Sequence, residues 1–108
     1  MPRFIVTGSY TADAMKAMIA NPSDREAAAR AAVEAAGGTL ESYYLTTGDS
    51  DFAIKVTADD ASDLITGLMV AGAGGGVTNL KTVRAWTSAE FTAMQKRAGE
   101  ISGAYKAP

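Results

Sequence analysis

The chain has 108 residues, of which 47% are hydrophobic and 20% are charged. This length and composition are typical of one folded domain and exclude a disordered chain. The sequence has no cysteine and no histidine, which removes disulfides, thiolate nucleophiles, thiolate-held metals and the commonest general base. A formal net charge of −2 argues against a nucleic-acid partner held by bulk positive charge.

No segment has the features of a signal peptide or a membrane span. The N-terminal apolar run, Phe4 to Val6, is far shorter than the ~20 residues needed to cross a bilayer. We therefore expect a cytoplasmic protein with no membrane partner. Alanine accounts for 22 residues, which predicts a core built largely from small side chains.

The first quarter of the chain predicts a strand and a short helix. Residues 3–10 are rich in β-branched and aromatic side chains, which is typical of a strand. Thr11 is expected to cap a helix over residues 12–20, where apolar residues follow the helical period. Asn21-Pro22 then interrupts the helix, because a residue before proline avoids the α region.

A longer helix and a hairpin follow. The alanine-rich segment 24–36 predicts a helix, with Ser23 as N-cap and Glu26 three residues later at capping-box spacing. Residues 39–47 and 51–57 predict two strands joined by a short turn, an antiparallel hairpin.

The second half of the chain repeats the helix and strand order. Asp59-Asp60 opens a helix that ends in the glycine-rich run Gly72 to Gly76, and residues 77–86 predict the fourth strand. Thr87 and Glu90 have capping-box spacing at the start of a last helix. The glycine run follows a helix and precedes a strand, the reverse of a dinucleotide fingerprint, so we interpret it as a loop, with a mobile lid as the alternative.

The predicted fold class is α+β. The element order is βαββαβ with a C-terminal helix, the ferredoxin-like arrangement with a four-stranded antiparallel sheet. We expect one domain over residues 1–98 and a loose C-terminal tail over residues 99–108.

Alternation along the strands predicts one apolar sheet face under the helices and one mixed face. In the hairpin we expect Tyr44 opposite Ala53 on the mixed face, with Lys55 beside them. The predicted apolar set of the hairpin is Tyr43, Leu45, Phe52, Ile54 and Val56. The predicted mixed set of the hairpin and the fourth strand is Ser42, Tyr44, Thr46, Asp51, Ala53, Lys55, Leu80, Thr82, Arg84 and Trp86. The first strand adds either Ile5, Thr7 and Ser9, which we favour, or Phe4, Val6 and Tyr10. An open face with this aromatic and aliphatic content favours a second copy as its cover, which predicts a two-fold dimer with a closed space between the sheets.

Several runs of residues occur together in an order found in a known family: Tyr10-Thr11, Arg25-Glu26-Ala27-Ala28, Ala35-Ala36-Gly37-Gly38, Tyr44-Leu45-Thr46-Thr47-Gly48, Asp51-Phe52, Thr82-Val83-Arg84-Ala85-Trp86-Thr87 and Glu90-Phe91. With these runs the chain resembles the GYD-domain family, small bacterial and archaeal proteins of the dimeric α/β-barrel superfamily. The resemblance covers about residues 3–98. The family's Gly-x-Tyr-Asp motif has serine in place of tyrosine here, as Gly48-Asp49-Ser50-Asp51. The resemblance implies the fold and a dimer, and it supplies no reaction.

Five residues are the predicted ligand-binding set: Tyr44, Asp51, Lys55, Arg84 and Trp86. On one face, the arginine would grip a carboxylate and the aromatic side chains would form flat walls, which suits a small anionic or aromatic ligand. The alternative is a structural Arg84–Asp51 pair with aromatic side chains packed in a dimer interface. Asp49 and Asp51 could hold a cation, but aspartates in turns mostly cap their own backbone, so we expect no metal and no cofactor.

The leading functional hypothesis is a homo-oligomeric module that binds a small ligand or a protein, with its site between paired sheets. The alternative is a cofactor-independent enzyme of the isomerase or monooxygenase type. In that enzyme Asp51 or Tyr44 would be the acid or base and Arg84 would hold the substrate carboxylate. RNA binding ranks third, because the RNP aromatic pattern and the positive charge are both missing.

Overall fold

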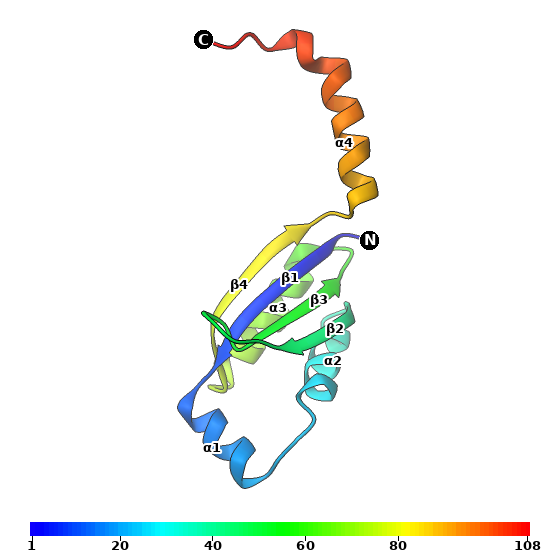
Figure 1. Cartoon of the computed structure of the whole chain (residues 1–108). Helices are drawn as coiled ribbons and strands as arrows, with labels where there is room; N and C mark the ends of the chain where they lie inside the picture. Colours follow the sequence, from blue (N-terminus) through cyan, green and yellow to red (C-terminus); the bar gives the residue numbers. More distant parts are fainter.

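The computed structural model describes residues 1–108. The elements in chain order are β1 (Arg3–Tyr10), α1 (Ala12–Ala20), α2 (Arg25–Ala35), β2 (Thr39–Leu45), β3 (Phe52–Thr57), α3 (Ala61–Ala73), β4 (Val77–Ala85), α4 (Ser88–Ile101) and a 3₁₀ turn, η1 (Ser102–Ala104). The strands form one antiparallel sheet in the order β2-β3-β1-β4 (Figure 1). The predicted α+β, ferredoxin-like βαββαβ fold with a C-terminal helix is confirmed.

Side-chain caps explain where the helices begin. The Thr11 hydroxyl accepts a hydrogen bond from the Ala14 amide at the start of α1, as expected. At the start of α2 the prediction of Ser23 as N-cap is wrong, because Asp24 is the cap and its carboxylate accepts from the Ala27 amide. Serine and aspartate both cap helices well. The helix begins one residue later than the spacing of Ser23 and Glu26 indicated.

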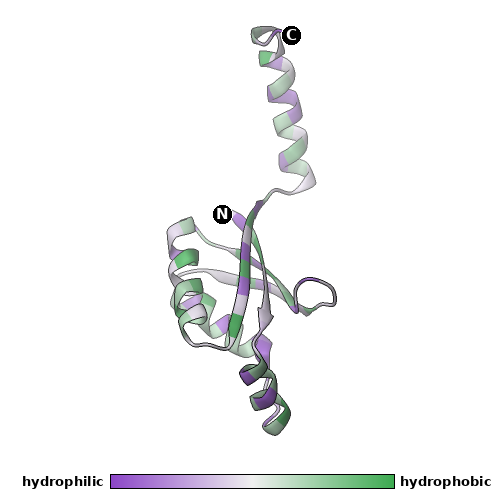
Figure 2. Cartoon of the chain, turned by 90° about the vertical axis from the view of Figure 1, so that its left-hand side faces the viewer, coloured by the Kyte–Doolittle hydropathy of each residue, from purple (hydrophilic) through white to green (hydrophobic).

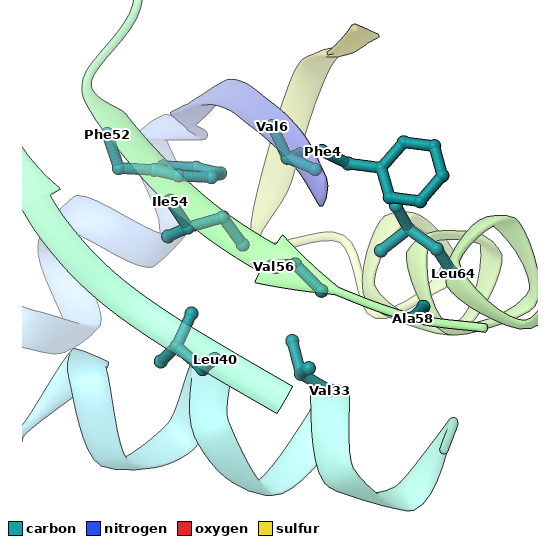
Figure 3. Packing of buried hydrophobic residues seen from close by; sticks show 9 residues of the cluster. All are labelled: Phe4, Val6, Val33, Leu40, Phe52, Ile54, Val56, Ala58 and Leu64. Atoms are coloured by element: carbon teal, nitrogen blue, oxygen red, sulfur yellow. The ribbon is translucent and has the colours of Figure 1, made fainter. Parts of the chain in front are cut away.

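Helices α2 and α3 cover one face of the sheet and leave the other face without a helix (Figure 2). The core lies between these helices and the sheet (Figure 3). Its nine buried hydrophobic residues are Phe4, Val6, Val33, Leu40, Phe52, Ile54, Val56, Ala58 and Leu64. Most come from the strands, because the alanines of α2 contribute little side-chain volume to the core.

The register of the central strands agrees with the alternation in the sequence. Tyr44 pairs with Ala53, Ser42 pairs with Lys55, and Lys55 in turn pairs with Ile5 of β1. These side chains lie on the open face, opposite the buried Phe4, Val6 and Ile54. The predicted faces of the hairpin and of the first strand therefore match the observed register.

The predicted face of the fourth strand is wrong. Val83 pairs with Ile5, while Arg84 pairs with the buried Phe4, so Val83 is on the open face and Arg84 is on the helix side. The β1–β4 register shifts between Thr7 and Ser9, where a bulge interrupts the ladder. The residues of β4 alone do not show which side chains face the helices. Leu80 lies on one face and Val83 on the other, and both are suited to burial.

Helix α4 extends away from the sheet and its helices (Figure 1). The chain measures 61 × 30 × 22 Å, and its radius of gyration of 17.6 Å exceeds the value expected for a compact chain. That expected value is about 13 Å for this length. Every residue from Trp86 to Pro108 is exposed, and α4 continues through the expected domain boundary after residue 98. No helix has the length and apolar content needed to cross a membrane.

Candidate functional site

The five residues of the predicted ligand-binding set do not meet on one face. Tyr44 and Lys55 lie on the open face, where the Tyr44 side chain is 66% exposed. Arg84 lies on the opposite face, and Trp86 follows the end of β4. A single pocket that joins Tyr44 and Arg84 is therefore not formed within the chain, and neither is the acid–base arrangement predicted for the enzyme alternative.

Asp51 stabilises the end of β1. Its Oδ2 accepts a hydrogen bond of 2.9 Å from the Tyr10 amide, and its own amide donates to the Gly8 carbonyl over 2.7 Å. The predicted Arg84–Asp51 pair is wrong, because the Asp51 side chain is held at this turn and Arg84 bonds elsewhere. The Asp51 side chain does not cap its own turn but accepts from an amide 41 residues away in the chain, which ties the segment before β3 to the end of β1.

Arg84 is held by backbone carbonyls and aromatic rings. Its Nη1 donates to the carbonyl of Arg3 over 3.2 Å and to the carbonyl of Ala85. The guanidinium carbon lies 4.5 Å from the centroid of the Trp86 ring and 5.7 Å from that of Phe4. These are cation–π distances, so Arg84 fixes the end of the sheet from which α4 departs.

A cavity of about 270 Å³ lies between the sheet and helices α2 and α3. Of its 20 lining residues, 17 are hydrophobic. The sheet side includes Phe52 and Ile54, and the helix side includes Ala29 and Ala32 of α2 and Leu68 of α3. We call this space the helix-side cavity.

Small residues account for the space. On α2 the side chains that point toward the sheet are mainly alanines, which end at Cβ and do not reach the strands. On α3, a Cβ at Gly67 would lie 3.0 Å from the Cβ of Ala36, so the two helices approach closely at that point. Close helix contact together with short side chains leaves unfilled volume above the sheet, unlike a normally packed interior.

One end of the helix-side cavity is polar. The hydroxyls of Tyr10 and Tyr43 form a hydrogen bond of 2.5 Å, and the Phe52 ring packs against both phenols. Arg25, the first residue of α2, also lines the cavity, and its Nη1 donates to the Ser23 hydroxyl over 3.3 Å. Its remaining N–H donors are free to bind an anionic group.

The pKa of Tyr43 is strongly raised. Burial of the phenol is the largest cause, and its hydrogen bond with Tyr10 adds to the effect. The nearby positive charge of Arg25 acts in the opposite direction. Tyr43 is therefore a neutral hydroxyl at physiological pH, able to donate or accept a hydrogen bond but not to act as a base.

A second, more open hollow of about 450 Å³ adjoins this end beneath α1. Tyr10, Arg25 and Val77 line both spaces, so they form the border between them. The start of α1 is tied to the glycine-rich loop, because the Thr11 hydroxyl donates to the carbonyl of Gly75 over 2.8 Å. Gly72 and Ala73 belong to α3, so the loop predicted over Gly72 to Gly76 is confirmed only for Gly74 to Gly76.

Sequence reasoning missed Tyr43 and Arg25 for identifiable reasons. An aromatic residue on the apolar face of a strand is typical of a core, and an arginine at the start of an alanine-rich helix is typical of a solvated surface, so neither residue enters the predicted ligand-binding set. A signal was present, because Tyr10 and Tyr43 both carry a hydroxyl on the strand face that holds the buried side chains. No group of three or more acidic, histidine or cysteine side chains converges anywhere in the structure.

The sheet topology and the apolar cavity define a small α+β protein with an apolar pocket between the sheet and helices α2 and α3. The family model of the GYD domain matches residues 4–94, so the chain belongs to the GYD-domain family. No curated protein matches the chain.

Two solved structures are similar to the chain. The crystal structure of FFRP-DM1 is 16% identical, with a TM-score of 0.49 over 80% of this chain and 100% of that one. A hypothetical protein, PHS023 from Pyrococcus horikoshii, is also 16% identical, with a TM-score of 0.48 over 82% of this chain and 93% of its own.

Proposed function

We propose that this protein is a binding module for a small molecule with an apolar body and an anionic end, held in the helix-side cavity. The observation that supports this best is the cavity itself, about 270 Å³ with 17 hydrophobic lining residues and the charged Arg25 at its border. A largely apolar pocket with a few convergent polar groups is the usual form of a small-ligand site. Its size favours a compact ligand.

The two ends of the cavity would recognise different parts of the ligand. Apolar surface transferred from water to the alanine-lined end gains about 25 cal/mol per Å². At the polar end, the guanidinium of Arg25 offers two parallel donors that match a carboxylate. The hydroxyls of Tyr10 and Tyr43 offer further hydrogen bonds there.

Three matched probes test this division of roles: 3-phenylpropanoate, its primary amide, and propylbenzene. NMR titrations of the isotope-labelled protein should show that 3-phenylpropanoate binds most tightly and its amide more weakly. Propylbenzene should shift the resonances of the same cavity residues. Arg25→Gln should weaken binding of the acid at least ~10-fold and leave propylbenzene unchanged. Arg30→Gln is the control, because Arg30 lies on the same helix, pairs with Glu26, and does not line the cavity. Failure of all three probes to bind, or equal binding of acid and amide, would contradict the proposal.

We also propose that the protein is a homo-oligomer that pairs through the open sheet face. Support comes from large hydrophobic side chains left uncovered on or beside that face: Ile5 at 37% exposed, Val83 at 57% and Tyr44 at 66%. Ile5 and Val83 are paired neighbours on this face, and soluble domains rarely leave large apolar side chains together on a sheet without a cover. Sedimentation equilibrium should give a mass at least twice that of the 11.1 kDa chain, and a monomer at micromolar concentration would contradict the pairing.

A further inference from the structure

We propose that the hollow beneath α1 is a second subsite for the same ligand, so that the protein selects apolar carboxylic acids with an acylamino group on the α-carbon. Arg25 lies at the border between this hollow and the helix-side cavity, together with Tyr10 and Val77. A carboxylate bound to Arg25 therefore has open space on two sides. A ligand that is branched at the α-carbon, next to its carboxylate, can fill both spaces at once. This inference rests on the binding of an anionic ligand at Arg25 proposed above.

One face of α1 forms a wall of the hollow. Ala14, Ala17, Met18 and the C-cap residue Asn21 line it, and their spacing is that of a single helix face. None of the residues in α1 is buried, so this face is not packed into the core. The hollow measures about 450 Å³, against about 270 Å³ for the helix-side cavity, so it has room for a substituent of several non-hydrogen atoms.

Backbone contacts hold the start of α1 in place over the hollow. The Thr11 amide donates to the Gly76 carbonyl over 3.0 Å, beside the hydrogen bond from the Thr11 hydroxyl to Gly75. A Cβ added at Gly76 would lie 3.7 Å from the Cβ of Ala14, which is ordinary van der Waals contact. The hollow is therefore a fixed feature of the fold, with one wall on α1 and another on the glycine-rich loop.

The polar side chains of the hollow suit an amide group. Ser23 accepts a hydrogen bond of 3.3 Å from Arg25, so its own hydroxyl proton is free to donate to a carbonyl. The Asn21 carboxamide offers two donors and an acceptor. An acylamino group carries one N–H and one C=O, which these two side chains would pair on the side of Arg25 that faces the hollow.

Charge determines which α-substituent fits. Arg25 is the only charged side chain in the lining of either space, and no carboxylate lines them. The ammonium of a free amino acid would lie close to the Arg25 guanidinium without an acidic partner, and like charges repel. Acylation of the nitrogen removes this charge and supplies the amide. The geometry therefore favours N-acyl derivatives of apolar amino acids over the free amino acids.

Three probes that differ only at the α-carbon test this selection: 3-phenylpropanoate, N-acetylphenylalanine and phenylalanine. They share the ring and the carboxylate, and the two chiral probes are titrated as separate enantiomers into the isotope-labelled full chain by NMR. We expect the better enantiomer of N-acetylphenylalanine to bind at least ~5-fold more tightly than 3-phenylpropanoate, because it adds one or two net hydrogen bonds. Phenylalanine of the same configuration should bind at least ~10-fold more weakly than its N-acetyl derivative, because of the repulsion at Arg25.

Filling the hollow provides the second test. Ala17→Phe places a ring in the hollow, and the ~5-fold difference between N-acetylphenylalanine and 3-phenylpropanoate should disappear. Ala20→Phe is the matched control, because Ala20 is exposed on the same helix and does not line the hollow; this variant should keep the difference. Circular dichroism checks that both variants fold.

The outcomes separate this inference from the function on which it rests. Binding of 3-phenylpropanoate as tight as that of N-acetylphenylalanine, or tighter, would overturn the second subsite and leave the site in the helix-side cavity intact. Equal binding of phenylalanine and its N-acetyl derivative would overturn the selection by charge. A difference that persists in Ala17→Phe would place the acetamido group outside the hollow and would also overturn the inference. Failure of every probe to bind the wild-type chain would overturn the proposed function as well.

Discussion

Filling the helix-side cavity should stabilise the protein and abolish ligand binding at the same time. Ala29 lines the cavity and packs against the core, so Ala29→Leu adds three carbon atoms to a space that is empty. Burial of three such groups at ~0.8 kcal/mol each adds about 2.4 kcal/mol to the free energy of unfolding. The lost rotamer freedom of leucine costs about 0.5–1 kcal/mol. The net increase in the free energy of unfolding is therefore about 1.5 kcal/mol, which raises Tm by roughly 6 °C.

Urea unfolding of Ala29→Leu measures this change directly. The matched control is Ala31→Leu, since Ala31 is exposed on the same helix and does not line the cavity; its stability should change by less than about 0.5 kcal/mol. The filled variant should also lose binding of 3-phenylpropanoate. If Ala29→Leu lowered the free energy of unfolding by 1–3 kcal/mol, as overpacking does, the site would already be filled and the reasoning would fail.

Three further predictions follow from single contacts. Gly8→Ala should lower the free energy of unfolding by about 1–3 kcal/mol in urea, because a Cβ there would stand 2.5 Å from Cζ of Phe52; no change would refute the crowding. The hydrogen bond from the Thr87 amide lowers the pKa of the Glu90 carboxyl in the folded protein. The cap therefore stabilises α4 fully above the pKa of glutamate in the unfolded chain, near ~4.3, and this stabilisation is lost as the pH falls through the lower pKa of the folded protein. Circular dichroism should show that loss in wild type below about pH 4 and not in Glu90→Gln. Burial raises the pKa of Tyr43, so its stabilisation is complete below the unfolded pKa near ~10 and falls at higher pH; Tyr43→Phe should remove this alkaline sensitivity in urea unfolding at two pH values.

Local patterns were sufficient to predict the elements and the hairpin. Helix starts follow from short polar caps such as Thr11 and Thr87, and the hairpin register follows from alternation of apolar residues across one turn. Each of these features depends on residues close in sequence. The resemblance predicted over about residues 3–98 is confirmed by the family model over residues 4–94.

The position of the site could not be predicted, because it depends on distant pairings and on empty space. The face of Arg84 is set by its pairing with Phe4 of β1, and nothing within β4 determines that register. The helix-side cavity exists because the alanines of α2 are too short to reach the sheet, and unfilled volume has no residue pattern of its own. Tyr43 was assigned to the correct face, but its partner Tyr10 is 33 residues away in the chain.

Alanine-methyl NMR of the protein with bound 3-phenylpropanoate tests the central claim most directly. The ring protons of the ligand should give intermolecular NOEs to the methyls of Ala29 and Ala32, which line the cavity, and none to the methyl of Ala31. NOEs to Tyr44 or Val83 on the open face, with none to α2, would contradict a site under the helices.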